Sequence, residues 1–268
     1  MIGAIIGDVV GSRFEFHNHK SKYFELITSG CEFTDDTVLT IAVMDWLLHS
    51  NKKTQETASE YLRKWGLKYP FAGYGGRFNR WLHTPEMGPY GSKGNGNAMR
   101  ISPVGWASND LEKVSALSDI VTGATHNHSE GIRGARVVAT LIAMARIGKT
   151  KEQLKQYISQ YYNVEFNYDE LKMLYTFNEL SENTIPQAFY CFLISNDFED
   201  CLRTTVSIGG DTDTLCAISC AIAEAYYKKI PDSLVKKVKS KLTQEMLDVV
   251  NEFEKQQSYN FCKAKKEI

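Results

Sequence analysis

Two short acidic clusters, far apart in the sequence, place the strongest constraint on how this chain can fold. Thr34-Asp35-Asp36-Thr37 and Asp211-Thr212-Asp213-Thr214 each stand directly before an apolar run with helical spacing. A helix that is apolar nearly all round belongs inside a core, so both clusters should lie where a core helix begins. Their carboxylates and hydroxyls offer enough oxygen ligands for one or two hard divalent cations such as Mg²⁺.

A simple helix cap is the alternative interpretation of each cluster, because Thr and Asp are preferred at helix N-termini. The occurrence of two such clusters favours a metal site. Together they would bury several carboxylates at the edge of the core, and no Arg or Lys lies within six residues after either cluster. Unpaired buried anions are costly, so a bound cation is the economical source of the opposite charge.

The remaining periodicity predicts an all-α fold, a compact helical bundle. Apolar residues recur at intervals of three and four, and almost no stretch alternates as a strand would. No linker-like segment divides the chain, so we expect a single domain over residues 1–268. Helices are expected over residues 2–14, 37–49 and 214–228, over 232–254, after Pro186, and around Leu62, Leu117, Leu141 and Ile158.

Composition predicts a soluble cytoplasmic protein. The net charge is −1, from 31 basic and 32 acidic residues, so no general affinity for nucleic acid is expected. No apolar run approaches the roughly 20 residues that cross a bilayer, and the N-terminus does not resemble a signal peptide. The six cysteines include no CxxC pair and are interpreted as buried, reduced thiols rather than as a disulfide framework or a zinc site.

Two glycine-rich segments are candidates for anion binding. Gly73–Phe78 and Gly91–Arg100 can bring backbone N–H groups close to an anion, although neither is a Walker A loop or a dinucleotide fingerprint. His126 could donate to a phosphate or ribose oxygen. His128 has the stronger case for being an ordinary exposed loop residue.

Two further acids stand in apolar or glycine-rich surroundings near the N-terminus. Asp8 is either a hydrogen-bonded structural acid or a partner of metal-bound water, and the sequence favours neither. Glu15 stands before a polar loop, so it could orient or deprotonate a water, whereas an isolated glutamate there would more often be a surface residue.

Five motifs, in this order, resemble those of the ADP-ribosylglycohydrolases. They are Gly7–Glu15, Phe33–Thr37, Gly94–Arg100, Thr125-His126 and Gly209–Thr214. The resemblance runs from residue 1 to about residue 231, and the helix expected over 232–254 carries no matching motif.

The resemblance implies an orthogonal all-α bundle with a two-metal centre, usually Mg²⁺ and sometimes Mn²⁺, at the base of a cleft. It implies metal ligation by Thr34, Asp35, Asp36, Asp211, Asp213 and Thr214. It implies catalytic roles for Glu15, Asp36 and Asp8. The implied pyrophosphate and ribose contacts are Gly75, Gly76, Ser92, Gly94, Asn95, Gly96 and His126, whereas Lys93 departs from the pattern because several relatives carry tyrosine there.

The implied reaction is hydrolysis at the anomeric carbon of an ADP-ribosyl group, with release of ADP-ribose from a modified protein, nucleic-acid base or small molecule. A catalytically silent ADP-ribose-binding regulator and a metal-dependent phosphohydrolase that cleaves the diphosphate are the alternatives. Retention of all six ligand positions and Glu15 favours the glycohydrolase. No residue of the sequence selects among arginine, serine, nucleobase and O-acetyl linkages.

Overall fold

The computed structural model describes the backbone of residues 1–264 and the side chains of residues 1–257. Within these residues the fold is all-α, as predicted, and the extended pairing is limited to an isolated bridge between Gly94 and Leu180. The first elements are α1 (Gly3–Gly11), η1 (Ser12–Phe14), α2 (Asp35–His49), α3 (Gln55–Lys68), α4 (Gly76–Leu82), α5 (Gly96–Met99), α6 (Ser102–Ala107), α7 (Leu111–Gly123) and α8 (Ser129–Arg146). They are followed by α9 (Lys151–Ile158), α10 (Tyr168–Leu174), η2 (Ser181–Asn183), α11 (Ile185–Ile194), α12 (Phe198–Ile208), α13 (Thr212–Tyr227), α14 (Asp232–Lys239) and α15 (Gln244–Ala264).

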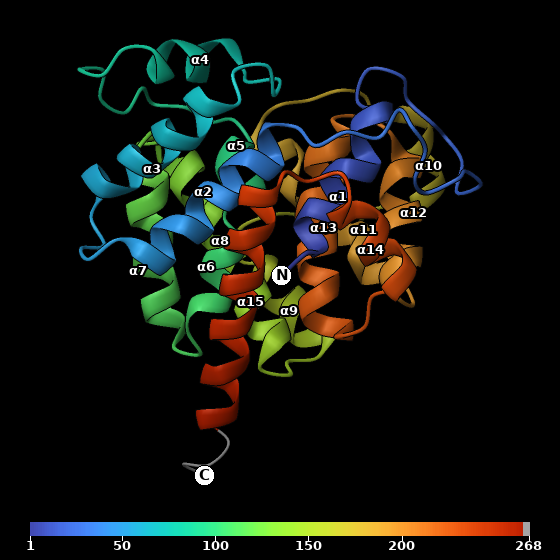
Figure 1. The fold of residues 1–268 in the computed structure, drawn as a ribbon. Helices are drawn as coiled ribbons and strands as arrows, with labels where there is room; N and C mark the ends of the chain where they lie inside the picture. The colour runs from blue at the N-terminus through green and yellow to red at the C-terminus, as the bar shows by residue number, and fades with distance from the viewer. Residues whose placement is uncertain (265–268) are drawn as a thin grey trace.

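Helices α1 and α13 form the centre of the molecule and lie side by side (Figure 1). Their contact depends on three glycines of α1 that are spaced four residues apart. A Cβ at Gly7 would lie 2.2 Å from the carbonyl oxygen of Cys216, and similar clashes would occur at Gly3 and Gly11. The absence of side chains at these positions therefore lets the two helix backbones touch, and this fixes how the N-terminus of α13 faces the C-terminal end of α1.

Both helices that follow an acidic cluster are core helices, as their apolar composition predicted. In α2 every residue from Asp36 to Trp46 is buried, and in α13 every residue from Thr212 to Ala225 is buried. Thr34 is the N-cap of α2, and its hydroxyl accepts from the backbone N–H of Asp36 at 3.3 Å. Asp211 stands at the N-cap of α13 but its side chain makes no capping bond there. The helix-cap interpretation thus describes Thr34 but does not account for the carboxylate of Asp211.

Two expectations about local structure need correction. The helix expected over residues 232–254 is two helices, α14 and α15, because Thr243 caps a new helix by accepting from the N–H of Met246 at 3.4 Å. Apolar periodicity continues across the break because Leu242, between the helices, is also buried. The glycine-rich segments are only partly loops, since α4 begins at Gly76 and α5 at Gly96.

The five cysteines whose side chains are described, namely Cys31, Cys191, Cys201, Cys216 and Cys220, are free and buried. Cys262 lies outside the residues whose side chains are described. Within the described part of the chain, every helix is too short or too polar to span a bilayer.

Candidate active site

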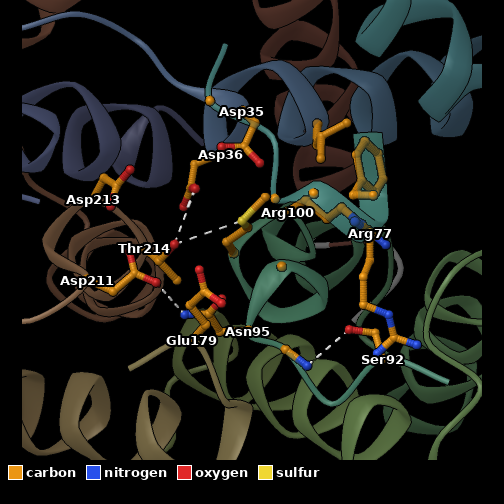
Figure 2. Close-up of a pocket in the computed structure, with 18 of the residues that line it drawn as sticks. Asp35, Asp36, Arg77, Ser92, Asn95, Arg100, Glu179, Asp211, Asp213 and Thr214 are labelled. Atoms are coloured by element: carbon orange, nitrogen blue, oxygen red, sulfur yellow. Dashed lines mark hydrogen bonds between the residues drawn. The ribbon is translucent and has the colours of Figure 1, made fainter. Parts of the chain in front are cut away.

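The two acidic clusters meet at the ends of α1, α2 and α13. The hydroxyl of Thr214 donates to Asp36 Oδ2 at 3.3 Å (Figure 2). Thr34 Oγ1 lies 3.3 Å from Asp213 Oδ2. Residues almost 180 positions apart in sequence are therefore in hydrogen-bond contact, with separations of 178 and 179 residues. A cation that is bound by both clusters requires them to lie this close together.

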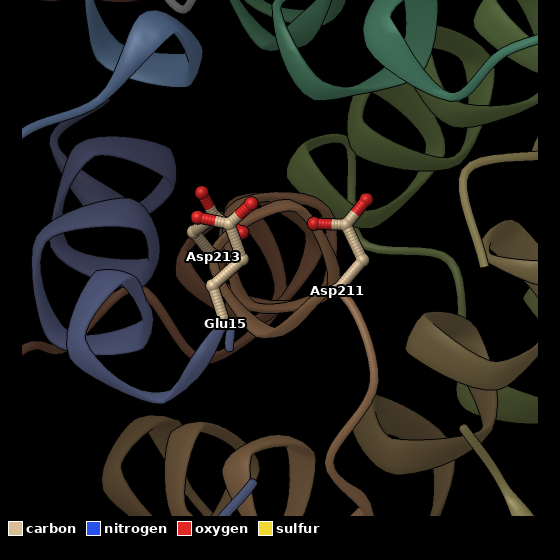
Figure 3. Close-up of side chains that lie close together, drawn as sticks. All are labelled: Glu15, Asp211 and Asp213. Carbon is tan, nitrogen blue, oxygen red and sulfur yellow. The ribbon is translucent and has the colours of Figure 1, made fainter. Parts of the chain in front are cut away.

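A second group of carboxylates includes an acid that we did not expect among the ligands. Glu15, Asp211 and Asp213 each offer one oxygen, and these oxygens all lie within 4.8 Å of one another (Figure 3). One hard cation can bridge oxygens at such separations, because Ca²⁺ and Mg²⁺ bind oxygen at about 2.0–2.6 Å. Glu15 therefore lies in a possible ligand position as well as in the position expected for a residue that acts on water.

Two carboxylate oxygens of the clusters are buried and unsatisfied. Asp36 Oδ1 and Asp213 Oδ1 accept no hydrogen bond from any residue in the described part of the chain. An unsatisfied buried anion is costly, and a hard divalent cation is a counter-charge that suits carboxylate oxygens such as these. The donor set, which consists of carboxylate and hydroxyl oxygens, suits Mg²⁺ or Mn²⁺.

Crowding among these acids changes their protonation. Burial, reinforced by neighbouring carboxylates, raises the pKa of Asp36 and Asp213 well above the usual range. Burial, together with the charges of Asp213 and Asp8, raises the pKa of Glu15 to about 8. Burial likewise raises the pKa of Asp211 to about 6, although a hydrogen bond from Asn95 Nδ2 at 2.7 Å opposes the shift. Without a cation the cluster therefore retains protons near neutral pH.

Asp8 holds α1 to the first turn of α2. Its carboxylate accepts from the backbone N–H groups of Thr34 at 2.9 Å and Thr37 at 3.0 Å, and from both of their hydroxyls. Asp8 is fully buried, and the cavity described next is not lined by it. These contacts match the structural alternative for Asp8, and its catalytic assignment stays a prediction.

A cavity of about 250 Å³ opens over the acidic clusters. Asp35, Asp36, Asp211, Asp213 and Thr214 line one end of it (Figure 2). Glu15, which lies beside Asp211 and Asp213, also lines the cavity. All seven residues expected to contact pyrophosphate and ribose also line it, namely Gly75, Gly76, Ser92, Gly94, Asn95, Gly96 and His126. Thr34 and Lys93, although both are described, are not part of the lining.

The two histidines of the Thr125–His128 segment have different surroundings. His126 is buried, its Nδ1 lies 2.6 Å from Thr125 Oγ1, and burial lowers its pKa well below the usual range. Its ring is therefore neutral near pH 7 and can donate one hydrogen bond. His128 is the N-cap of α8, where its ring nitrogen accepts from the N–H of Glu130 at 3.1 Å. The expectation of an ordinary loop histidine at 128 was wrong, because this contact gives it a capping role.

A sequence model of one family, described as ADP-ribosylglycohydrolase, matches residues 1–259. The chain belongs to the ADP-ribosylglycohydrolase family. The resemblance stated from the five motifs is thereby confirmed.

Individual relatives of the chain are distant in sequence, but the matches cover most of their length. The ADP-ribosylhydrolase ARH3 of Homo sapiens is 26% identical over 312 residues, covering 87% of this chain and 86% of that protein. The ADP-ribosyl-dinitrogen reductase glycohydrolase of Rhodospirillum rubrum is 26% identical over 275 residues, covering 91% and 90%. A solved structure titled ADP-ribosylglycohydrolase-related protein complex superposes with a TM-score of 0.70 at 22% identity, covering 92% of this chain and 93% of that one, and it supports the fold alone.

Several residues that line the cavity were not predicted from the sequence. Arg77 and Arg100 stand inside the glycine-rich segments. The sequence identified these segments as candidates for anion binding but did not show that the two arginine side chains line the cavity. Tyr90 adjoins one segment, whereas Phe177 and Glu179 come from the irregular chain between α10 and η2, which no motif marks.

The two arginines give the cavity a cationic wall. Arg100 is buried and donates to Thr125 Oγ1 at 2.6 Å, while its Nε has no partner in the described chain. Burial lowers the pKa of Arg100 to about 10, so the group is still charged at neutral pH. Arg77 donates to the backbone oxygen of Tyr90. The cavity is therefore acidic at one end and basic at the other (Figure 2).

Proposed function

We propose that this protein is a metal-dependent hydrolase that cleaves the glycosidic bond at the anomeric carbon of ADP-ribosyl groups and releases ADP-ribose. The observation that carries the proposal is the two-ended cavity, which has a hard-oxygen cluster at one end and the glycine-rich segments with Arg77 and Arg100 at the other. A ribose that bears a diphosphate has the matching polarity, with a diol at one end and an anion at the other.

The ligand roles that we propose use both acidic clusters. Asp35, Asp36, Asp211 and Asp213 would hold up to two divalent cations, Mg²⁺ or Mn²⁺, with Thr34 and Thr214 completing the oxygen set. The orphaned buried oxygens of Asp36 and Asp213 support this assignment. A divalent cation bound there would supply Lewis-acid polarisation of ribose hydroxyls and of a water molecule.

The chain's own residues would position the substrate and accept the proton that the attacking water releases. Backbone N–H groups of the glycine-rich segments and the cationic wall would hold the diphosphate, and binding energy from this remote group would orient the ribose. Glu15 lies within reach of the acidic cluster and carries a pKa that burial raises to about 8. A carboxylate poised near neutral pH suits the acceptance of a proton from water as the anomeric carbon develops oxocarbenium character.

Release of free ADP-ribose from a panel of defined linkages, in the presence of Mg²⁺, is the direct test. We expect cleavage of at least one arginine-, serine-, nucleobase- or acetyl-linked substrate. Formation of AMP and ribose phosphate would instead identify the phosphohydrolase alternative. Binding of ADP-ribose without turnover of any linkage would identify the silent regulator and contradict the proposal.

The acid cluster predicts how pH and Mg²⁺ act together on stability. The pKa values of Glu15 and Asp211 are raised above their unfolded values, to about 8 and about 6, so the metal-free native state holds protons that the unfolded chain has released. Stability is then lost as pH rises through these folded values, and the melting temperature of metal-free protein should fall between about pH 5.5 and about pH 8.5.

Saturating Mg²⁺ should raise the melting temperature, by about 5 °C or more if its concentration exceeds the dissociation constant about 100-fold. The rise should be larger at the higher pH, because protons no longer compete with the cation. Differential scanning fluorimetry with and without chelator measures both effects. An Mg²⁺ response that is absent, or equal at the two pH values, would contradict this prediction.

A further inference from the structure

The chain directly before Asp211 makes a turn that glycine adopts far more readily than other residues. Gly209 and Gly210 join the end of α12 to Asp211 with φ angles of 68° and 87°. Glycine tolerates such positive angles, but it also loses more conformational freedom on folding than any other residue. The turn therefore needs contacts from other segments to keep one conformation, and the position of Asp211 depends on that conformation.

Two side chains of the polar loop (residues 17–31) lie directly against this turn. Asn18 Oδ1 accepts a hydrogen bond from the backbone N–H of Gly210 at 2.7 Å, across a sequence separation of 192 residues. A Cβ atom at Gly209 would lie 2.8 Å from Asn18 Oδ1 and 2.9 Å from Lys20 Nζ, which leaves no room for a side chain. The polar loop thus packs on the backbone of the turn.

Lys20 joins the end of α12 to the irregular segment 175–180. Its ammonium donates to the carbonyl oxygen of Ile208, the last residue of α12, at 2.5 Å and to that of Tyr175 at 2.7 Å. A cation at a helix C-terminus is favourable because the carbonyl groups there carry partial negative charge. Both acceptors are backbone carbonyls, so these contacts fix the path of the main chain on the α12 side of the turn.

The ring of Tyr175 makes a further contact with the turn. A Cβ atom at Gly210 would lie 2.3 Å from Tyr175 Cε1, so the ring rests on the glycine backbone. The Tyr175 hydroxyl donates to the carbonyl oxygen of Asn183 at 2.6 Å, and Lys20 holds the Tyr175 carbonyl. Lys20 therefore acts on the turn directly, through Ile208, and also through the residue that packs on it.

The carboxylate of Asp211 has few restraints other than this turn. Asn95 Nδ2 donates to its Oδ2 at 2.7 Å, and its side chain makes no capping bond to α13. Figure 3 shows Asp211 beside Glu15 and Asp213, on the chain that leads into α13. Mg²⁺ requires nearly ideal octahedral geometry at about 2.0–2.1 Å from oxygen, so a small shift of one ligand weakens its binding.

We propose that Asn18 and Lys20 are positioning residues for the metal centre, which hold the Gly209-Gly210 turn so that Asp211 meets the cation. Both lie outside the cavity lining, so they would act through the backbone and touch neither cation nor substrate. This inference rests on the proposed metal-dependent function and adds two residues of the polar loop to it.

Isothermal titration of Mg²⁺ into the wild-type protein and into Lys20→Met and Asn18→Ala tests the inference. Each variant should raise the dissociation constant of Mg²⁺ by about 10-fold, at the lower end of the range for residues that orient a metal ligand. Asn18 is exposed, so Asn18→Ala should fold normally and decides the test if Lys20→Met does not fold.

Lys22→Met is the matched control. Lys22 is partly buried like Lys20 and also joins the polar loop to α12, but it pairs with the carboxylate of Asp200 at 3.0 Å. Its loss should lower the melting temperature without changing the dissociation constant of Mg²⁺. An equal weakening of Mg²⁺ binding in Lys22→Met and Lys20→Met would show that general anchoring of the loop is responsible, and would overturn the inference.

A kinetic measurement separates a positioning role from a structural one. With a substrate that the wild type cleaves, Lys20→Met should turn over slowly at an Mg²⁺ concentration that just saturates the wild type. Raising Mg²⁺ by the same factor as the increase in dissociation constant should restore kcat, whereas a misfolded site would not recover. Rates are compared well below the melting temperature of each variant.

The remaining outcomes distinguish this inference from the function on which it rests. An unchanged dissociation constant in either folded variant overturns the positioning role, even if the melting temperature falls, and leaves the proposed hydrolase intact. Failure of the wild type to bind Mg²⁺ or Mn²⁺ overturns the proposed metal dependence, and the inference falls with it. Weaker Mg²⁺ binding in both variants, in a protein that cleaves no ADP-ribosyl linkage, supports the positioning role and overturns the proposed reaction alone.

Discussion

Replacing Asp213 with Asn should abolish the stabilisation by Mg²⁺ and reduce turnover by at least about 1,000-fold, because several kcal/mol of metal-assisted stabilisation would be lost. The same change should raise the melting temperature of the metal-free protein. Asp213 is buried, one of its oxygens is unsatisfied, and burial with the charge of Asp211 raises its pKa, so a neutral amide relieves repulsion in the native state. Thermal melts with and without Mg²⁺, together with steady-state rates, measure all three effects.

Asp45 supplies a matched contrast for this prediction. It is as buried as Asp213, at 4% exposed against 3%, but it pairs with Lys64 at 2.8 Å and accepts from Trp65 Nε1 at 2.8 Å. These partners lower its pKa although burial opposes them, which is the opposite of the direction at Asp213. Asp45→Asn should therefore destabilise the protein and leave the Mg²⁺ response in place. If Asp213→Asn also destabilised the metal-free protein, the acid cluster would be structural and the metal site would be refuted.

Replacing Glu15 with Gln should lower kcat by about 100- to 10,000-fold, the usual range for loss of a general base, while Mg²⁺ still stabilises the protein. Glutamine keeps the size and one oxygen of the side chain but cannot accept a proton from water. Asp36, Asp211 and Asp213 would remain to hold the cation. Single-turnover rates measure the loss of chemistry, and the melting temperature with Mg²⁺ measures retention of the metal.

An oxygen of Glu15 also lies within 4.8 Å of oxygens of Asp211 and Asp213, so Glu15 could itself be a metal ligand. Loss of the Mg²⁺ response in Glu15→Gln would identify Glu15 as a metal ligand rather than as a base. Unchanged kcat would remove it from catalysis altogether. Glu32→Gln, a change at an exposed glutamate near the same polar loop but outside this cavity, is the control and should alter neither measurement.

The sequence predicted the fold and the site best where a local residue pattern marks both a helix and the acids at its start. The apolar runs after Thr37 and Thr214 predicted core helices, and the acids before them predicted where those helices begin. Helix periodicity and capping preference are local, so they can be recognised without knowing the fold. The same patterns could not detect the break between α14 and α15, because the buried Leu242 continues the apolar spacing through the turn.

Residues that reach the cavity from irregular segments were not predictable. Glu179 lines the cavity because its segment is hydrogen-bonded to Asn95, a contact across 84 residues that leaves no local pattern. Arg77 and Arg100 stand in segments that were identified for their glycines, yet whether an arginine points inward depends on tertiary packing. The proximity of Glu15 to Asp211 and Asp213 likewise depends on how closely α1 approaches α13.

The glycine contact between α1 and α13 also limits which parts of this protein can change by substitution. A methyl group at Gly7 would meet the backbone of Cys216, so the spacing between the helices that carry the acids cannot be adjusted by small substitutions. Phe177 and Glu179 line the cavity from an irregular segment, where substitutions are tolerated more readily. Changes in this segment could therefore alter the lining of the cavity in related chains while the spacing of the acidic clusters stays the same.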